Sequence, residues 1–289
     1  MKNKQTKIAL IYDFDGTLSR GNMQEATFIP DVCRMSAKDF WNEVVDDAAK
    51  HNADERLCYM YKMLDKAKGA NVSLKREAFE KHGKNVPLFE GVLEWFDGIN
   101  QYAVEQGIDI KHFVISSGNK ELINGTPIAK YFEQIFACEF YYDIDGIATK
   151  PAVAIDYTNK TQYLFRINKK VLTGGKNEHG KTVNDFVPDE DRDIPFTNMI
   201  YIGDGDTDIP CMKLVKDKGG FSIGVYDDEV KKEAVKRLQN DGRINYMAEA
   251  NYASRSDLMC VVKKALNSMH AKTVLHNHTK SIQTIEPNT

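Results

Sequence analysis

Residues 13–18 read DFDGTL and directly follow the apolar run IALIY at residues 8–12. An aliphatic and β-branched run of this length indicates a buried parallel strand. Asp13 and Asp15 stand just beyond its carboxyl end, where open α/β sheets place their chemistry. Side chains two positions apart on a strand share a face, so the two carboxylates can converge on one ligand. Gly16 then allows the backbone to turn sharply. Taken alone, this motif would fit an ordinary solvated turn better.

A second acidic cluster follows a second buried-strand pattern. The run MIYIG at residues 199–203 leads directly into DGDTD at residues 204–208. Acids from two strand ends supply the oxygen ligands that a hard divalent cation such as Mg²⁺ requires. A calcium loop of the helix–loop–helix type is excluded, because its glycine position is Ile209 and its terminal glutamate position is Val215. The two clusters together therefore favour a metal site.

The run FVISSGN at residues 113–119 predicts a strand that ends in hydroxyls and a glycine. A serine hydroxyl and consecutive backbone N–H groups at a helix entrance form a phosphate cradle. Ser116 is preferred as the phosphate ligand, because Gly118 and Asn119 then open the helix. Ser117 is the one-residue alternative. Without the other motifs, Ser-Gly is only an ordinary turn signal.

Lys160 stands where a helix is expected to begin, just ahead of QYLFR at residues 162–166. A lysine in a first helical turn is usually solvated, and the helix dipole slightly disfavours it. A neighbouring phosphate and several carboxylates would give it a reason to be there. Lys150 is the competing cation, but it precedes Pro151, and a residue before proline is disfavoured in a helix. We therefore expect Lys160 to be the lysine of the site.

These polar groups, in this order along the chain, resemble the four motifs of the haloacid dehalogenase-like (HAD) hydrolases: Asp13 with Asp15, Ser116, Lys160, and Asp204 with Asp208. The first and fourth motifs are specific, and the other two fall in the right order. Within that superfamily the chain is most similar to the phosphoserine-phosphatase-like branch, whose cap is inserted between the first and second motifs. The resemblance implies an α/β fold with a Rossmann-like, parallel-sheet core and a small helical cap.

The resemblance also implies a reaction, the hydrolysis of a phosphomonoester. Asp13 would attack phosphorus and form an aspartyl-phosphate. Asp15 would protonate the leaving oxygen and then activate the water that hydrolyses the intermediate. Dehalogenases of the superfamily lack an acid at this second position, so Asp15 favours phosphate chemistry.

The binding groups follow from the same resemblance. Mg²⁺ would be held by the carboxylate of Asp13, the backbone carbonyl of Asp15 and Asp204, with Asp208 orienting Lys160 or a metal-bound water. Lys160 would balance the charge of nucleophile and phosphate. The expected phosphate-binding set is Gly16, Ser116, Ser117, Gly118 and Lys160.

The implied domain organisation is a catalytic core at residues 1–18 and 89–289 with a helical cap at residues 19–88. Leu57, Met60, Tyr61 and Leu64 recur at helical spacing in the cap and are expected to form the packed side of a helix. Further strands are expected at residues 111–115, 135–140, 221–225 and 244–247, and a closing helix at residues 257–266.

The polar C-terminal end of the chain and one internal polar segment are interpreted as peripheral. Residues 169–195 are expected to be an excursion of the core. Residues 270–289 are expected to form a flexible tail, and its three histidines fit a frayed terminus better than a metal site.

Composition restricts the partners. The formal net charge of −3 over 289 residues gives no electrostatic footprint for nucleic acid. The apolar run before Asp13 is too short for a signal peptide, and no stretch approaches a membrane span. Five scattered cysteines show no metal-site spacing and are typical of reduced thiols in a cytoplasmic protein.

The sequence says less about the substrate than about the reaction. In phosphoserine phosphatases, a glutamate lies nine residues after the nucleophile. This glutamate helps to recognise the amino group of the substrate. That position is Asn22 here, and Glu25 lies about one turn later. This departure weighs against phosphoserine. A small phosphorylated metabolite is expected, because an inserted cap must close over the site and exclude water.

Two alternatives share most of these features. A phosphotransferase or phosphomutase would use the same core residues and pass the phosphoryl group to a sugar hydroxyl. A HAD-fold binding protein with little turnover would have no need for Asp15. Among the cap cations, Arg20, Lys50 and Arg56 could meet a substrate anion, although each also fits a solvated surface charge.

Overall fold

In the computed structural model, which describes residues 5–283, a seven-stranded sheet forms the centre of the protein. The strand order is β4-β3-β2-β1-β5-β6-β7, and all neighbouring pairs are parallel except β3 with β4. The central strand β1 (Thr6–Tyr12) pairs with β2 (Ile108–Asn119) and β5 (Met199–Gly203). This confirms the expected α/β fold.

The other strands extend the sheet on both sides. They are β3 (Phe132–Tyr142), β4 (Ala148–Val153), β6 (Phe221–Tyr226) and β7 (Tyr246–Glu249). All strands expected from the sequence overlap these elements. Strand β4 was missed, because it is an antiparallel edge strand in which half of the residues are exposed and the sequence carries no apolar pattern.

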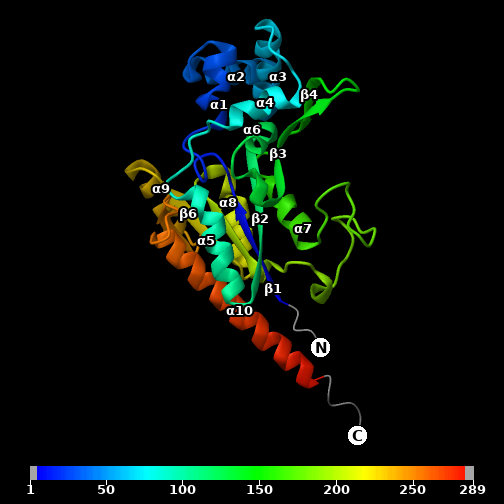
Figure 1. Ribbon diagram of the computed structural model, residues 1–289, viewed down its shortest axis with the longest axis vertical. Coiled ribbons are helices and arrows are strands. Elements are labelled where there is room, and N and C mark those ends of the chain that lie inside the picture. Colours follow the sequence, from blue (N-terminus) through cyan, green and yellow to red (C-terminus); the bar gives the residue numbers. More distant parts are fainter. Residues whose placement is uncertain (1–4, 284–289) are drawn as a thin grey trace.

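Helices cover both faces of the sheet (Figure 1). α5 (Val92–Glu105) leads into β2 and packs against the last helix, α10 (Asp257–Gln283). α7 (Lys160–Asn168) packs against α8 (Ile209–Asp217), while α9 (Glu229–Asn240) packs on β6 and β7. Because parallel crossovers are right-handed, connections that run in opposite directions from β1 place their helices on opposite faces.

A helical insert follows β1, as expected. Its helices α1–α4 gather beyond one end of the sheet (Figure 1). They are α1 (Met23–Ala26), α2 (Ala37–His51), α3 (Glu55–Gly69) and α4 (Arg76–Gly83), with a π-helical segment at Ile29–Cys33. Ser36 and Asp54 cap α2 and α3 by accepting hydrogen bonds from backbone N–H groups of their first turns.

The buried side of α3 differs in part from the expected stripe. Met60 and Leu64 are buried, but Leu57 is 36% exposed and Tyr61 is 49% exposed. The remaining buried positions on this helix are Tyr59, Met63 and Ala67. The spacing of four apolar residues fits more than one helical face, and the contacts made by the neighbouring elements select among them.

The end of the insert is joined closely to the core. A Cβ atom added to Gly125, just after α6 (Lys120–Asn124), would lie 1.7 Å from the carbonyl oxygen of Glu80 in α4. The backbone N–H of Ala148 donates to the carbonyl of Leu74 at 2.9 Å. The guanidinium of Arg76 lies 4.2 Å from the ring centre of Tyr142. The α4 end of the insert is therefore anchored to α6 and to the β3–β4 hairpin.

The C-terminal helix is longer than expected. α10 continues to Gln283, through most of the segment expected to be a flexible tail, and residues 284–289 lie outside the described residues. Ser256 caps it by accepting from the N–H of Met259. Met269 is buried, and His270 Nδ1 lies 2.8 Å from Thr6 Oγ1, so contacts with the core hold the helix beyond residue 266.

Two further observations concern membrane-spanning helices and the cysteines. Within residues 5–283, no helix has the length and apolar character needed to cross a bilayer. The cysteines are all free thiols, at positions Cys33, Cys58, Cys138, Cys211 and Cys260.

The close approach at Gly125 gives a first prediction. Gly125→Ala should lower the free energy of unfolding by about 1–3 kcal/mol, because the new methyl group has no room against the α4 backbone. Gly69→Ala is the matched control, since a Cβ atom added there would meet no described atom within 4 Å and alanine favours the helix. Urea denaturation of both variants measures the difference. Equal effects would contradict the anchoring of α4.

Candidate functional site

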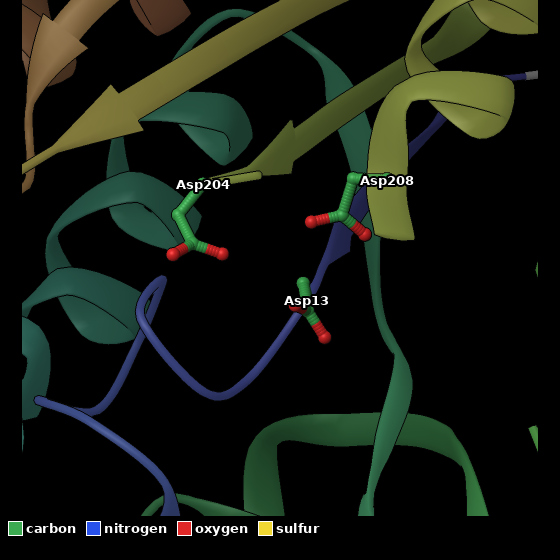
Figure 2. A group of neighbouring side chains, drawn as sticks. All are labelled: Asp13, Asp204 and Asp208. Carbon is green, nitrogen blue, oxygen red and sulfur yellow. The ribbon is translucent and has the colours of Figure 1, made fainter. Parts of the chain in front are cut away.

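Three aspartates converge at the carboxyl ends of the two central strands. Asp13 directly follows β1, whereas Asp204 and Asp208 follow β5. Figure 2 shows their side chains, which approach one another from these two segments. One carboxylate oxygen from each lies within 4.8 Å of the others. The sheet therefore brings together the two acidic clusters that the sequence indicated.

Lys160 is the counter-charge of this cluster. It is the first residue of α7, and its side chain is 0% exposed. Its Nζ lies 3.2 Å from Asp13 Oδ1 and donates to Asp208 Oδ1 at 2.8 Å and to Thr207 Oγ1 at 3.0 Å. Burial alone would lower the pKa of Lys160, but the charges of Asp13 and Asp208 outweigh it and raise the pKa. The ammonium group therefore stays charged.

The competing lysine lies elsewhere. Lys150 is in β4, is exposed, and has its Nζ 5.1 Å from the ring centre of Tyr141. The structure thus brings Lys160, and not Lys150, to the acidic cluster.

Asp208 is fixed by a tyrosine that the sequence analysis missed. The hydroxyl of Tyr201 donates to Asp208 Oδ1 at 2.7 Å, beside the hydrogen bond from Lys160. Gly203 leaves room for this carboxylate, because an added Cβ would lie 2.5 Å from Asp208 Oδ2. This geometry suits a residue that orients Lys160. The only sequence signal for Tyr201 is a polar group inside an otherwise apolar strand.

Asp15 also lines the cavity and is held by two hydrogen bonds. Its Oδ1 accepts from the N–H of Met23 at 2.8 Å and from Ser19 Oγ at 3.2 Å. Burial raises the pKa of Asp15 to about 7, although these hydrogen bonds oppose the shift. A carboxyl group that is half protonated near neutral pH suits general acid–base catalysis.

The carboxyl groups of Asp13 and Asp204 also have raised pKa values. The pKa of Asp13 is raised by burial first and by the charge of Asp208 second. The pKa of Asp204 rises to about 6 through burial and the same charge, while Lys231 opposes the shift. Lys231, in the first turn of α9, lies 3.1 Å from Asp204 Oδ2. No motif marks this lysine in the sequence.

Glycine at position 16 is required by the turn and by the site. Its φ is +74°, and an added Cβ would lie 2.1 Å from Asp204 Oδ2. Any side chain here would strain the backbone and also displace the Asp204 carboxylate. The sharp turn after Asp15 thereby allows the first and fourth motifs to touch.

The acidic cluster can hold a divalent cation. Asp208 Oδ2 is buried and has no hydrogen-bond partner among the described residues, whereas Asp13 Oδ1 has only its ion pair with Lys160. Buried carboxylate oxygens need a compensating cation or donor. An all-oxygen donor set of Asp13, Asp204 and Asp208 suits a hard ion such as Mg²⁺.

Both candidate serines border the same cavity. Ser116 Oγ accepts from the N–H of Gly118 at 3.0 Å. Ser117 Oγ is buried without a hydrogen-bond partner within the described part of the chain. The carbonyl of Ser117 accepts from the hydroxyl of Tyr59 at 3.1 Å. The geometry therefore keeps both hydroxyls as candidates.

The cavity has a volume of about 240 Å³ and two walls of different character. Residues of the core line one wall: Asp13, Asp15, Ser116, Ser117, Gly118, Asp204, Gly205 and Thr207. Residues of the insert line the other: Asn22, Gln24, Trp41, Arg56 and Tyr59.

The three cap cations considered from the sequence, Arg20, Lys50 and Arg56, differ in their relation to this cavity. Of the three, Arg56 lines it. Arg20 lies 4.8 Å from the ring centre of Phe89, and Lys50 is exposed on α2. Sequence reasoning could not separate them, because each is a cation in a polar helical segment.

The role of Lys160 gives a second prediction. Lys160→Met should lower the free energy of unfolding at pH 7 by about 3–5 kcal/mol, because Asp13 and Asp208 lose a buried counter-charge. The exposed Lys150→Met should change it by less than about 0.5 kcal/mol. Urea denaturation with a chelator present measures both, since the chelator prevents divalent cations from compensating. A stable Lys160→Met protein would argue against the charge network.

The amino-acid sequence was compared with known protein families and with individual proteins. No protein-family model matches the chain. An uncharacterised protein of Borreliella burgdorferi is 31% identical over 285 residues, covering 89% of this chain and 96% of that protein. At this identity and coverage the two proteins are members of one family.

Solved structures establish the fold. A HAD-family hydrolase of Salmonella enterica serovar Typhi aligns with a TM-score of 0.51 and 16% identity, over 80% of this chain and 66% of that chain. A phosphoserine phosphatase with an analogue of its phospho-aspartyl intermediate aligns with a TM-score of 0.51 and 18% identity, over 90% of this chain and 99% of that chain. The chain therefore belongs to the family of the Borreliella burgdorferi protein and has the fold of the HAD hydrolases.

Proposed function

We propose that the protein is a Mg²⁺-dependent phosphatase that hydrolyses a small phosphomonoester through an aspartyl-phosphate on Asp13. The observation that carries the proposal is the convergence of different chemical groups on one cavity. The cavity is lined by the carboxylate of Asp13, which is paired with the buried Lys160, and by the carboxyl group of Asp15, whose pKa is about 7. The hydroxyl-bearing residues Ser116 and Ser117 line it as well.

Phosphoryl transfer depends mainly on positioning and on neutralising spread negative charge. In the first step, an oxygen of Asp13 attacks phosphorus as the bond to the leaving oxygen breaks. Asp15 gives its proton to that oxygen. In the second step, Asp15 takes a proton from water, which attacks phosphorus and releases phosphate from Asp13. The pKa of Asp15, near 7, suits both proton transfers.

Other residues hold the phosphoryl group in this scheme. Lys160 offsets the charge of Asp13 and the phosphate, and its own contacts with Asp208 and Thr207 fix its position. Ser116 or Ser117, with the backbone N–H groups around Gly118 and Gly16, would bind the phosphoryl oxygens.

Asp13, Asp204 and the backbone carbonyl of Asp15 are the proposed Mg²⁺ ligands, with Asp208 beside them. When bound, the cation would neutralise charge on the phosphoryl oxygens. The insert over the carboxyl ends of the strands would keep bulk water out. We also propose a cytoplasmic location, which the free thiols of the chain support.

The reaction gives a third prediction. Asp13→Asn should abolish Mg²⁺-dependent phosphate release from a panel of small phosphomonoesters, because an amide is not a nucleophile here. Circular dichroism controls for folding, and EDTA should silence the unmodified protein. Trapping a protein-bound phosphoryl group that is absent from Asp13→Asn would identify the intermediate.

The same assay separates the alternatives. Labelled phosphoryl groups that appear on an added sugar hydroxyl and not as free phosphate would indicate a phosphotransferase. Normal turnover by folded Asp13→Asn would contradict the mechanism. Asp15→Ala should also lose most turnover, because Asp204, the other cavity carboxyl group whose pKa is raised to about 6, is a proposed Mg²⁺ ligand and is paired with Lys231.

The serine pair gives a fourth prediction. Replacing the phosphate-binding serine by alanine should lower kcat/KM by about 10²-fold or more, as the loss of a donor to a developing charge does elsewhere. Ser116→Ala is expected to show the larger loss, and Ser117→Ala is its matched control. Steady-state kinetics of the two variants compares them directly. The reverse order would assign the role to Ser117.

A further inference from the structure

The insert wall of the cavity holds two polar groups that have no partner among the described residues. Gln24 is 2% exposed, and its Oε1 makes no hydrogen bond within the described chain. The Nε atom of Arg56 is likewise buried without a partner. Both residues line the cavity. Buried polar groups are normally satisfied, so two exceptions that border one cavity point to a ligand that satisfies them.

The guanidinium of Arg56 is only loosely paired. Its nearest recorded acidic oxygens belong to Asp156, at 3.7 Å, and Glu55, at 3.9 Å. Both distances exceed those of a hydrogen bond. Arginine binds carboxylate or phosphate through two parallel N–H donors, and this geometry remains available to an anionic group in the cavity.

Among the described residues, the insert wall carries no carboxylate. Glu25 is the acid nearest in sequence to the position that would read an amino group, but it does not line the cavity. Its Oε1 accepts from Trp41 Nε1 at 2.6 Å and from Asn22 Nδ2 at 2.7 Å. Glu25 thus positions Trp41. The described insert therefore offers one cation and two neutral amides to the ligand, but no anion for an ammonium group.

We propose that Gln24 and Arg56 form the subsite for the part of the substrate that is not transferred. This inference rests on the proposed phosphatase function. The substrate is a small phosphomonoester that carries a second anionic group and a hydroxyl but no ammonium group. Arg56 pairs with the anion. The amide of Gln24 both donates and accepts, which suits a hydroxyl.

Three phosphomonoesters of the same carbon length test the proposal. 3-Phosphoglycerate carries a carboxylate and a hydroxyl, O-phosphoserine replaces that hydroxyl by an ammonium group, and glycerol 3-phosphate lacks the carboxylate. We expect kcat/KM for 3-phosphoglycerate to exceed that of each of the others by about tenfold or more. A propanediol bisphosphate tells whether a second phosphate can replace the carboxylate. Equal or better hydrolysis of O-phosphoserine or glycerol 3-phosphate would overturn the proposal.

Two variants assign the roles and give a fifth prediction. Gln24→Glu should raise the O-phosphoserine to 3-phosphoglycerate ratio of kcat/KM by about tenfold, because a carboxylate attracts the ammonium group and repels the anion. Arg56→Gln should reduce the preference for 3-phosphoglycerate over glycerol 3-phosphate by a similar factor. Lys50→Gln is the matched control, because it removes an exposed cap cation outside the cavity. Unchanged ratios in both test variants would count against the subsite.

A phosphomonoester whose leaving group carries no second anion separates this inference from the proposed function. Mg²⁺-dependent hydrolysis of p-nitrophenyl phosphate that requires Asp13, combined with no preference among the three esters, would leave the function intact and overturn the subsite. Absence of hydrolysis that requires Asp13 would instead contradict the function. Calorimetry would then test the subsite with the unmodified protein and both variants. Tighter binding of 3-phosphoglycerate than of O-phosphoserine, weakened in Arg56→Gln, would support it, and equal binding would overturn it.

Discussion

The buried ammonium group of Lys160 is the interaction on which the site depends. Four carboxylates lie at or next to the ends of two strands, and burial disfavours the ionised form of each one that borders the cavity. Without a cation in contact with them, such groups would take up protons or open the structure to water. Lys160 contacts two of these carboxylates directly. It thereby allows charged groups to remain at the edge of an apolar core.

The parallel sheet explains how distant residues meet. Strands β1, β2 and β5 are neighbours and run in the same direction, so their carboxyl ends open on one edge. Residues more than a hundred positions apart in the chain therefore border one cavity. Lys160 reaches the same edge from the start of α7. The sharp turn at Gly16 and the absence of side chains at Gly16 and Gly203 leave space for the Asp204 and Asp208 carboxylates.

The two walls of the cavity divide the work. The core wall carries the acids and the serines, with Lys160 behind Asp13, and the insert wall carries amides, aromatic rings and one arginine. In the proposed function, the reaction depends on the core wall and the choice of substrate on the insert wall, so the two would be separable by mutation. The anchored α4 end gives the insert a fixed support against α6. Glu25 accepts a hydrogen bond from Trp41 Nε1 and does not line the cavity, so its closeness in sequence to position 22 does not bring its carboxylate to the site.

The buried parallel strands and the acidic motifs were readable in the sequence, since each depends on local residue patterns such as an apolar run that ends in acids. The helical insert was expected from the family resemblance, and the exposed edge strand β4 left no apolar pattern. Lys160 could also be preferred to Lys150 by local reasoning about proline. Tyr201, Lys231, Gln24 and the choice of Arg56 among the cap cations required the folded chain. Their importance comes from contacts between distant segments, and a contact of that kind leaves no periodic or compositional trace in the sequence.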